Sequence, residues 1–552
     1  MSRKFITQHL LLLAGVCLMV ACRHKKPPRQ QVIVKNVKEL HEAIPENIAE
    51  RLSYMSDNNG IMEDSVPAAS AALQFFYGQH KNVAQWSDNG IASSNADTML
   101  YLVQHAMDAG LLPERYHGGA LSAAMYQIKT DSNARKDAAL WAKVDVMMSD
   151  AFMKMASHLH FGVAPRDSIT LRTDSVFTDV SLAGMLQQAL QQKNISETLH
   201  KLEPTHSAYL TLKQQMLVFR EKYQGLRWDT IPENYTDTLA FKQQLLNRLV
   251  QGAYVDTSGR PGDTTLLKDG VKAFQREFNL YPDGVAGKKT RQMLNRSLYD
   301  WQVQVALNLD RWRKMPDSMP NRYILVNVPA YQLNVVDSGE VVLQSRVIVG
   351  APRTRTPLLN SRMANFMMFP YWRVPYSIVF KEMLPAIRKN INYLADKNLE
   401  VIDRDGNAVD PYTIDWNKLG KGHFPYVLRQ MDGVDNSLGI MKFNFMNKYS
   451  VYLHDTNSRG LFKNNYRALS HGCVRVQEWD SLAMYLIQDD TLRHTRDSVR
   501  LWLAMQEKKQ VNFSRRVPIY IRYFSADVQD DHLLFYEDIY GEDKRLRKII
   551  GY

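Results

Sequence analysis

The chain has 552 residues, which suggests several domains of ordinary size. Hydrophobic residues make up 45% and charged residues 23%, so we expect globular folding over most of the chain rather than extended disorder. The formal net charge is +12, but we find no nucleic-acid-binding motif or concentrated basic stripe and expect no nucleic-acid partner; attraction to anionic lipid or to a carboxylate-bearing polymer fits this charge as well.

Residues 1–21 have the pattern of a secretion signal. Arg3 and Lys4 precede the apolar run from Leu10 to Ala21, which is short for a membrane span. The phrase that ends in Cys22 is similar to a lipobox, whose cleavage leaves this cysteine at the N-terminus carrying lipid. An uncleaved anchor helix is the alternative interpretation. We therefore expect an exported protein with a lipid anchor at Cys22.

The cysteine count points to one reactive thiol. The three cysteines are Cys17, Cys22 and Cys473. Processing at the lipobox would remove Cys17 and lipidate Cys22, which leaves Cys473 as the sole free thiol and allows no intramolecular disulfide. An exported protein that keeps one unpaired cysteine is a candidate for thiol chemistry.

Residues 22–45 are predicted to be a mobile tether, because the stretch is basic and contains Pro27-Pro28. Residues 46–239 are predicted to be a helical scaffold domain. Apolar residues follow helical spacing over 68–77, 97–110 and 144–161, and the methionines of the last segment are interpreted as core filler. No residue of the scaffold stands out as a candidate for catalysis.

Residues 240–297 are predicted to be a compact helical module. Val271, Phe274 and Phe278 follow helical spacing, Asp283-Gly284 indicates a turn, and Thr290 precedes a short helix. A connecting helix follows within residues 298–320, where apolar residues at three- and four-residue spacing predict one buried stripe.

Residues 321–552 are predicted to be a mainly β domain, which makes the whole chain an α+β multidomain protein. Residues 323–328, 331–336 and 341–349 alternate as strands do, and 337–339 form a hairpin turn. The β pattern stops between about 376 and 425, an insertion of the kind that often serves as a lid. Beyond Cys473 we expect a helix over 477–487 and strands over 517–523 and 533–540.

The pattern Ser470-His471-Gly472-Cys473-Val474-Arg475 carries the candidate chemistry. A thiol needs a base to attack efficiently, and His454 is the candidate, on a predicted strand that also carries Tyr452 on the same face. Two bland interpretations compete with this one. The first is a buried structural cysteine beside a core histidine. The second is a zinc site made of His454, His471 and Cys473.

The histidine, the spacer and the Ser-His-Gly-Cys-Val-Arg phrase together resemble the active-site signature of the L,D-transpeptidases, the YkuD-type cysteine enzymes of bacterial cell-wall synthesis. Residues 240–297 resemble the small helical peptidoglycan-binding module. The phrases around Gly110 and His158 are similar to the scaffold of the larger, YcbB-like Gram-negative branch, whose members also carry a substrate-capping subdomain where residues 376–425 lie. These resemblances favour the enzyme over both bland interpretations.

The resemblance implies a reaction. Cys473 would attack the third-residue carbonyl of a peptidoglycan tetrapeptide stem, D-alanine would leave, and an amine of a neighbouring stem would attack the thioester to form a 3→3 cross-link. His454 would take the thiol proton and later protonate the leaving amine. The Asp455 carbonyl would orient the imidazole, with the Asp455 side chain as a rival. The N–H groups of Gly472 and Cys473 would bind the oxyanion.

The remaining site residues keep alternative interpretations. Tyr452 is either a further hydroxyl donor or a packing residue. His471 is expected to shape the oxyanion loop. Ser470, Arg475 and Trp372 are candidates for binding substrate. Arg475 could instead lower the thiol pKa or form a structural salt bridge, the interpretation that we favour slightly, and Trp372 could be a buried aromatic residue. We expect no metal and no cofactor.

Three rival functions remain open. Water as the acceptor would make the same site an L,D-carboxypeptidase, and another amine would make it a wall-attachment enzyme. A lipid-anchored tether that only grips peptidoglycan is the non-catalytic rival. In each case the resemblance implies a periplasmic location in a Gram-negative-type bacterium, with peptidoglycan stems and a membrane as partners.

Overall fold

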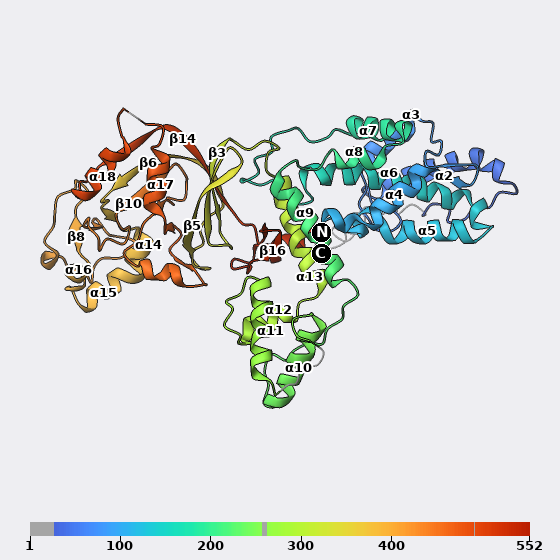
Figure 1. Ribbon diagram of the computed structural model, residues 1–552. Helices are drawn as coiled ribbons and strands as arrows, with labels where there is room; N and C mark the ends of the chain where they lie inside the picture. Colours follow the sequence, from blue (N-terminus) through green and yellow to red (C-terminus); the bar gives the residue numbers. More distant parts are fainter. Residues whose placement is uncertain (1–26, 257–261, 491) are drawn as a thin grey trace, which may run out of the picture.

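The computed structural model describes residues 27–256, 262–490 and 492–552 (Figure 1). The predicted signal peptide, residues 1–21, and the predicted lipidation site, Cys22, lie outside these ranges. Within them, no helix combines the length and the apolar character that crossing a membrane requires.

The N-terminal part is a helical domain built around one central helix, as predicted. Its helices are α2 (Leu40–Asp57), α3 (Ser70–Gln79), α4 (Ser94–Gln104), α5 (Gly118–Thr130), α6 (Ala138–Phe161), α7 (Asp179–Gln192) and α8 (Ile195–His200). Helix α6 is buried along most of its length because the other helices pack around it. Its methionines fill this core, which confirms their interpretation as packing residues.

The predicted tether is wrong from Val32 onward. The Val32 N–H donates to Asp137 Oδ1 at 2.8 Å, and the Val34 N–H donates to the Lys136 carbonyl at 3.0 Å. Helix α2 then begins at Leu40, whose side chain is buried in the scaffold core. The stretch is held because its apolar side chains and backbone N–H groups both find partners at the start of α6.

The second part contains the predicted module and the connecting helix. Its helices are α9 (Ser207–Tyr223), α10 (Thr238–Gln251), α11 (Thr264–Glu277), α12 (Lys288–Leu294) and α13 (Leu298–Arg313). The predicted turn is present at Gly284, which has a φ of +76° that favours glycine. The Gln275 amide donates to Asp283 and to the Val285 carbonyl and so fixes this turn between α11 and α12.

The C-terminal part is a β domain whose sheet closes on itself. Its strands are β3 (Arg322–Asn327), β4 (Gln332–Asp337), β5 (Glu340–Gly350), β6 (Leu359–Met368), β10 (Met441–Phe445), β11 (Leu453–His454), β12 (Ala468–Ser470), β13 (Val474–Val476) and β14 (Gln510–Arg522). They form a nine-stranded sheet in the order β12-β5-β13-β11-β10-β6-β14-β3-β4, and β4 also pairs with β5. This additional pairing closes the strands from β5 to β4 into a ring, as in a barrel, and β12 extends the sheet beside the end of β5. The helices α17 (Trp479–Leu486) and α18 (Arg496–Ala504) lie in this domain.

Two predicted strands are shorter than expected. Strand β11 contains only Leu453 and His454, because Ser450 takes a φ of +56° and the Asn447 side chain accepts the N–H groups of Tyr449 and Val451 in a turn. Near the C-terminus, the strand predicted over 533–540 ends as β16 (His532–Phe535), paired with β15 (Ala526–Gln529).

The insertion in the β domain folds as a small cap with its own core. It contains β7 (Trp372–Arg373), α14 (Tyr376–Ile378), the π-helical turn η6 (Val379–Met383), α15 (Leu384–Lys389), α16 (Tyr393–Asp396), β8 (Leu399–Ile402) and β9 (Val427–Gln430). The order of its sheet is β7-β9-β8. The predicted interruption of the β pattern therefore marks a separate packing unit.

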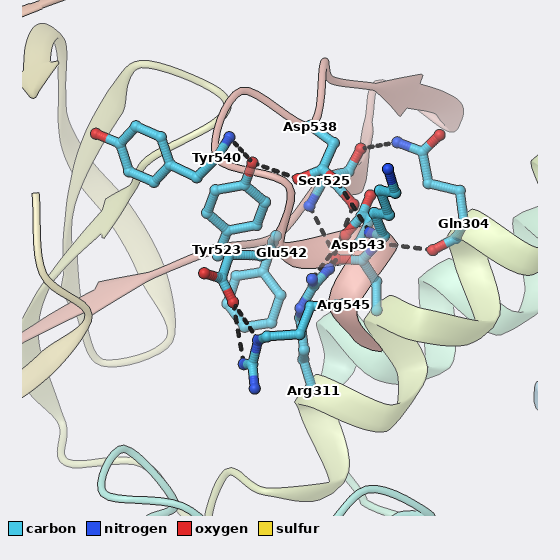
Figure 2. Close-up of polar contacts among 12 residues, drawn as sticks. Gln304, Arg311, Tyr523, Ser525, Asp538, Tyr540, Glu542, Asp543 and Arg545 are labelled. Atoms are coloured by element: carbon cyan, nitrogen blue, oxygen red, sulfur yellow. Dashed lines mark hydrogen bonds and ion pairs between the residues drawn. The ribbon is translucent and has the colours of Figure 1, made fainter. Parts of the chain in front are cut away.

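The chain end connects the β domain to the connecting helix. Residues 526–535 pack with α9 and α13, outside the barrel core. Figure 2 shows the polar cluster at this junction: Gln304 donates to the Ser525 carbonyl, and Tyr523 donates to Asp538 at 2.7 Å. The last helix, α19 (Glu542–Ile550), lies against α13. The packing thus crosses the boundary that we predict at residue 321.

Candidate active site

The pairing of β11 with β13 places the predicted site residues on one face. These strands run parallel, with Leu453 opposite Val474 and both side chains fully buried in the barrel core. Side chains alternate along a strand, so the neighbours of this pair point the other way. That outer face carries four predicted residues: Tyr452, His454, Cys473 and Arg475.

The Cys473 sulfur lies close to Tyr452. The backbone N–H and the hydroxyl of Tyr452 both lower the pKa of the thiol, and Trp372 of the cap lowers the pKa of the Tyr452 hydroxyl. The structure therefore brings Trp372 and Tyr452 to the thiol and favours the donor interpretation of Tyr452 over simple packing. Burial raises the pKa of the Cys473 thiol, while the hydrogen bonds from Tyr452 and the nearby cations oppose that rise.

This environment predicts slow alkylation of Cys473 at neutral pH. Because burial raises the thiol pKa above its ordinary value of 9.0, the thiolate fraction should keep increasing as pH rises past 9. We expect iodoacetamide to label Cys473 more slowly at pH 7.5 than it labels glutathione, with a rate that climbs through the alkaline range. Tyr452→Phe should shift this rise to still higher pH, since one hydrogen bond to the thiolate is lost. A rate plateau reached below pH 8 would contradict the prediction.

The imidazole of His454 is oriented by the backbone. Its Nδ1 lies 2.5 Å from the Asp455 carbonyl oxygen, so Nδ1–H donates and the Nε2 lone pair is left for proton transfer. Burial, with repulsion from Arg475 and Lys442, lowers the pKa of His454 to about 3. The ring is therefore neutral at pH 7, as a general base must be.

The Asp455 side chain does not orient His454. Its carboxylate accepts from the Ile440 N–H at 3.0 Å and pairs with Arg459 at 2.7 Å. Gly439 approaches this carboxylate so closely that an added Cβ would lie 2.3 Å from Oδ2. Of the two orienters left open by the sequence, the contacts favour the carbonyl.

Thiol and imidazole share a face, but no hydrogen bond joins them in the part of the chain that the structure describes. His454 lies level with Arg475 in the register, so Cys473 sits one side-chain position further along the same face. Catalytic hydrogen bonds are often long before substrate binds and tighten in the complex, so the shared face is the informative feature.

The loop before Cys473 corrects two predictions. Ser470 is buried, and its hydroxyl donates to the Cys473 carbonyl at 2.6 Å and accepts the Gly472 N–H at 3.1 Å. Ser470 therefore shapes the loop and is not available to bind substrate. The Gly472 N–H is likewise engaged, which leaves the Cys473 N–H as the loop's oxyanion donor. Gly472 has a φ of +123°, and this geometry is the reason for glycine there.

A second loop, residues 350–356, holds the first in place. Thr356 Oγ1 donates to the Gly472 carbonyl at 2.8 Å and accepts the Gly350 N–H at 2.8 Å. Tyr540 in turn donates to the Gly350 carbonyl and accepts the Thr356 N–H. Through Tyr523, this network continues into the polar cluster beside α13 (Figure 2). The C-terminal tail thus supports the loop that carries the thiol.

Thr356→Val is expected to lower kcat by about 10-fold or more, because losing the bond to the Gly472 carbonyl leaves a buried acceptor unsatisfied and lets the Cys473 N–H drift. Thr356→Ser, which keeps the hydroxyl, should restore most of the rate. Thr130→Val serves as the matched control, since that hydroxyl donates to a carbonyl on an exposed scaffold helix. Equal rates for Thr356→Val and the control would contradict the prediction, which is measured as turnover of a stem-peptide donor.

His471 faces the cap rather than the sulfur. Its Nε2 lies 2.6 Å from Glu382 Oε1 on the π-helical turn η6, and both side chains are about half exposed. The contact ties the catalytic loop to the cap. An exposed pair of this kind contributes roughly 0–1 kcal/mol, so we expect only few-fold changes in rate from Glu382→Gln.

Arg475 has no carboxylate partner among the described residues, which disfavours the salt-bridge interpretation. Its Nε is buried without a hydrogen bond. Burial lowers the pKa of Arg475, and the nearby Cys473 raises it. A second cation lies on the same face and was missed by sequence reasoning. Lys442 on β10 pairs with His454 in the register, and its Nζ lies 4.2 Å from the centroid of the Tyr452 ring. Its position after a polar loop gave no signal, since only the pairing of β10 with β11 brings it here.

No three or more His, Cys, Asp or Glu side chains gather in a metal-binding arrangement within the described ranges. The zinc interpretation of His454, His471 and Cys473 therefore has no support in the geometry, because His471 turns toward the cap.

Comparison with known proteins agrees with this geometry. A family model described as the L,D-transpeptidase catalytic domain (YkuD) matches residues 321–490, the range that contains both His454 and Cys473. Over this range the chain is similar to the YkuD-type L,D-transpeptidase domains. A "Scaffold domain" matches residues 71–216, and a "Putative peptidoglycan binding domain" matches residues 242–294. These matches confirm the predicted family and the predicted order of a helical region before a mainly β domain.

One curated relative and one solved structure are similar to this chain. The "Putative L,D-transpeptidase" of Haemophilus influenzae is 36% identical over 243 residues, which cover 44% of this chain and 48% of that protein. This chain thus spans about half the length of the curated relative that it matches. The "Structure of the Ldtfm-avibactam carbamoyl enzyme" covers 39% of this chain and 61% of its own, at 11% identity and a TM-score of 0.15. That likeness is too weak to support any argument.

Proposed function

We propose that this protein is a peptidoglycan L,D-transpeptidase that forms 3→3 cross-links through a thioester on Cys473. The observation that carries the proposal is the single strand face on which a thiol, a neutral imidazole and a tyrosine hydroxyl meet, inside a matched L,D-transpeptidase domain. The matched peptidoglycan-binding domain supports peptidoglycan as the substrate class.

The first half-reaction forms the thioester. His454 Nε2 takes the Cys473 proton as the sulfur attacks the third-residue carbonyl of a tetrapeptide stem. The Cys473 N–H and the Tyr452 hydroxyl donate to the oxyanion of the tetrahedral intermediate. When the intermediate collapses, the carbon–nitrogen bond breaks, and the His454 proton passes to the departing D-alanine amine.

The second half-reaction reverses these roles with a new amine. A side-chain amine of a neighbouring stem attacks the thioester, His454 takes the amine proton, and the thiol is regenerated. Water in place of the amine would give an L,D-carboxypeptidase, and an amine on another molecule would give wall attachment. The position of Trp372 of the cap beside Tyr452 supports a bound acceptor over water, since a cap that closes over the site would exclude solvent.

We further propose that the protein works in the periplasm, with Cys22 lipidated and residues 242–294 gripping the wall. Peptidoglycan stems are available in this compartment. The periplasm is oxidising, but a single thiol has no partner within the chain with which to form a disulfide. Globomycin-sensitive processing and incorporation of labelled palmitate at Cys22 would test the anchor.

Incubation of the purified protein with tetrapeptide-rich muropeptides tests the catalytic proposal. We expect dimers whose fragmentation shows a 3→3 bond, together with one free D-alanine for each dimer. Tripeptide monomers without dimers would favour the carboxypeptidase, and unchanged muropeptides with retained binding would favour the non-catalytic tether.

A further inference from the structure

A cavity of about 570 Å³ lies between β10 and the turn that precedes β11 and shares Tyr452 with the candidate active site. It is lined by Lys442, Asn444, Asn447, Lys448, Ser450 and Tyr452, with three apolar neighbours. Its volume is that of an ordinary small-ligand site. Tyr452 connects the cavity to the candidate active site, because it lines the cavity and its hydroxyl lies close to Cys473.

The lining of this cavity is suited to an anion. Among the described residues that form it, two are lysines, two are asparagines and none is acidic. The Asn447 amide is already committed to the carbonyls of Phe445 and Val451, and the Asn444 amide donates to Asn365. The cavity therefore offers positive charge from its lysines, while the amide N–H groups of its asparagines already donate to other groups.

Lys442 is the inner of the two lysines and is prepared for a partner. Its ammonium group rests over the face of the Tyr452 ring at 4.2 Å, and no carboxylate of the described chain pairs with it. A buried ammonium group without a counter-charge is costly, and burial accordingly lowers its pKa. A ligand carboxylate would supply the missing charge.

The strand register places Lys442 on the same face as the thiol. Lys442 pairs with His454 across β10 and β11, so the two side chains lie on one side of the sheet. Its Nζ lies over the ring of Tyr452, whose hydroxyl lies close to Cys473. A carboxylate bound by Lys442 would therefore lie on the face that carries the nucleophile.

We propose that this cavity is the leaving-residue subsite and that Lys442 binds the terminal carboxylate of the donor peptide. The inference rests on the proposed function and deepens it, because it explains why attack would occur one residue from a free C-terminus. An acceptor stem also carries carboxylates, so donor and acceptor must be varied separately.

The test compares a tetrapeptide donor with the same donor as its C-terminal carboxamide, which removes the charge and keeps the shape. Release of the terminal residue is measured for the wild type, Lys442→Met and Lys442→Arg, with Lys548→Met on the exposed face of α19 as the control. Wild type should favour the acid by about 10–100-fold in kcat/KM, the range expected for a hydrogen bond to a charged group. Lys442→Met should lose this factor on the acid alone, Lys442→Arg should keep most of it, and thermal unfolding should verify that each variant folds.

Three outcomes would overturn the inference. Lys442→Met could slow acid and amide donors equally, which would place the lysine in thiol activation or folding. Lys442→Met could still favour the acid donor over the amide donor as strongly as the wild type does, which would show that the lysine does not bind the carboxylate. It could leave donor release intact and weaken only the use of an acceptor acid relative to its amide, which would assign the subsite to the acceptor. A wild type that releases no D-alanine at all would instead contradict the proposed function.

Discussion

Cys473→Ala is expected to abolish the release of D-alanine from a tetrapeptide donor, with a fall in kcat on the order of 10⁴ or more. The sulfur is the group on the shared strand face that forms the thioester, and a methyl group in its place cannot attack the carbonyl. D-Alanine is measured enzymatically under conditions in which the wild type turns over many times.

A binding assay separates chemistry from folding in this experiment. The Cys473→Ala protein should still sediment with insoluble peptidoglycan, because residues 242–294 lie in a separate packing unit. If the variant keeps the full biological effect of the wild type, the result would favour a non-catalytic tether that only binds peptidoglycan. Cys473→Ser should also be inactive, since a hydroxyl is much harder to ionise beside a neutral imidazole.

His454→Gln is expected to lower kcat/KM by about 10³-fold, within the range for general acid–base catalysis. The glutamine fills the space but cannot carry a proton between sulfur and leaving amine. The pH profile carries a second expectation. Because the pKa of His454 is lowered to about 3, its ring remains neutral across pH 5–8, and the wild-type rate should not titrate with an ordinary histidine near 6.5.

The direction of the pH effect follows from the thiol. Because the raised pKa keeps the thiol protonated and His454 takes its proton during attack, kcat/KM should stay level through the neutral range and change only where the thiol ionises at alkaline pH. His471→Gln offers a comparison, since that ring contacts Glu382 on the cap, and only a few-fold change is expected. A loss from His471→Gln as large as that from His454→Gln would contradict the assignment of the base.

The nucleophile and base were predictable because they sit in a local pattern. The short phrase 470–475 and one upstream histidine are recognisable without knowing the fold. The register that joins them was not, because Leu453 and Val474 pair across a long loop and only the tertiary structure sets their alignment. Lys442 was missed for the same reason, as it enters through a third strand.

Loop details were less predictable than residue identities. Gly472 was predicted as an oxyanion donor, but the hydrogen bond from its N–H to Ser470 depends on a side-chain rotamer that no pattern specifies. For residues 22–45 the prediction missed order that the structure shows. The basic residues and Pro27-Pro28 predict a tether, yet Asp137, far along the chain, accepts a hydrogen bond from the Val32 N–H.

Intact-protein mass spectrometry after mixing with a tetrapeptide donor tests the central claim most directly. The account predicts a covalent adduct equal to the donor minus D-alanine, mapped to the peptide containing Cys473 and absent from Cys473→Ala. Turnover to 3→3 dimers without any such adduct, or an adduct on another residue, would contradict it.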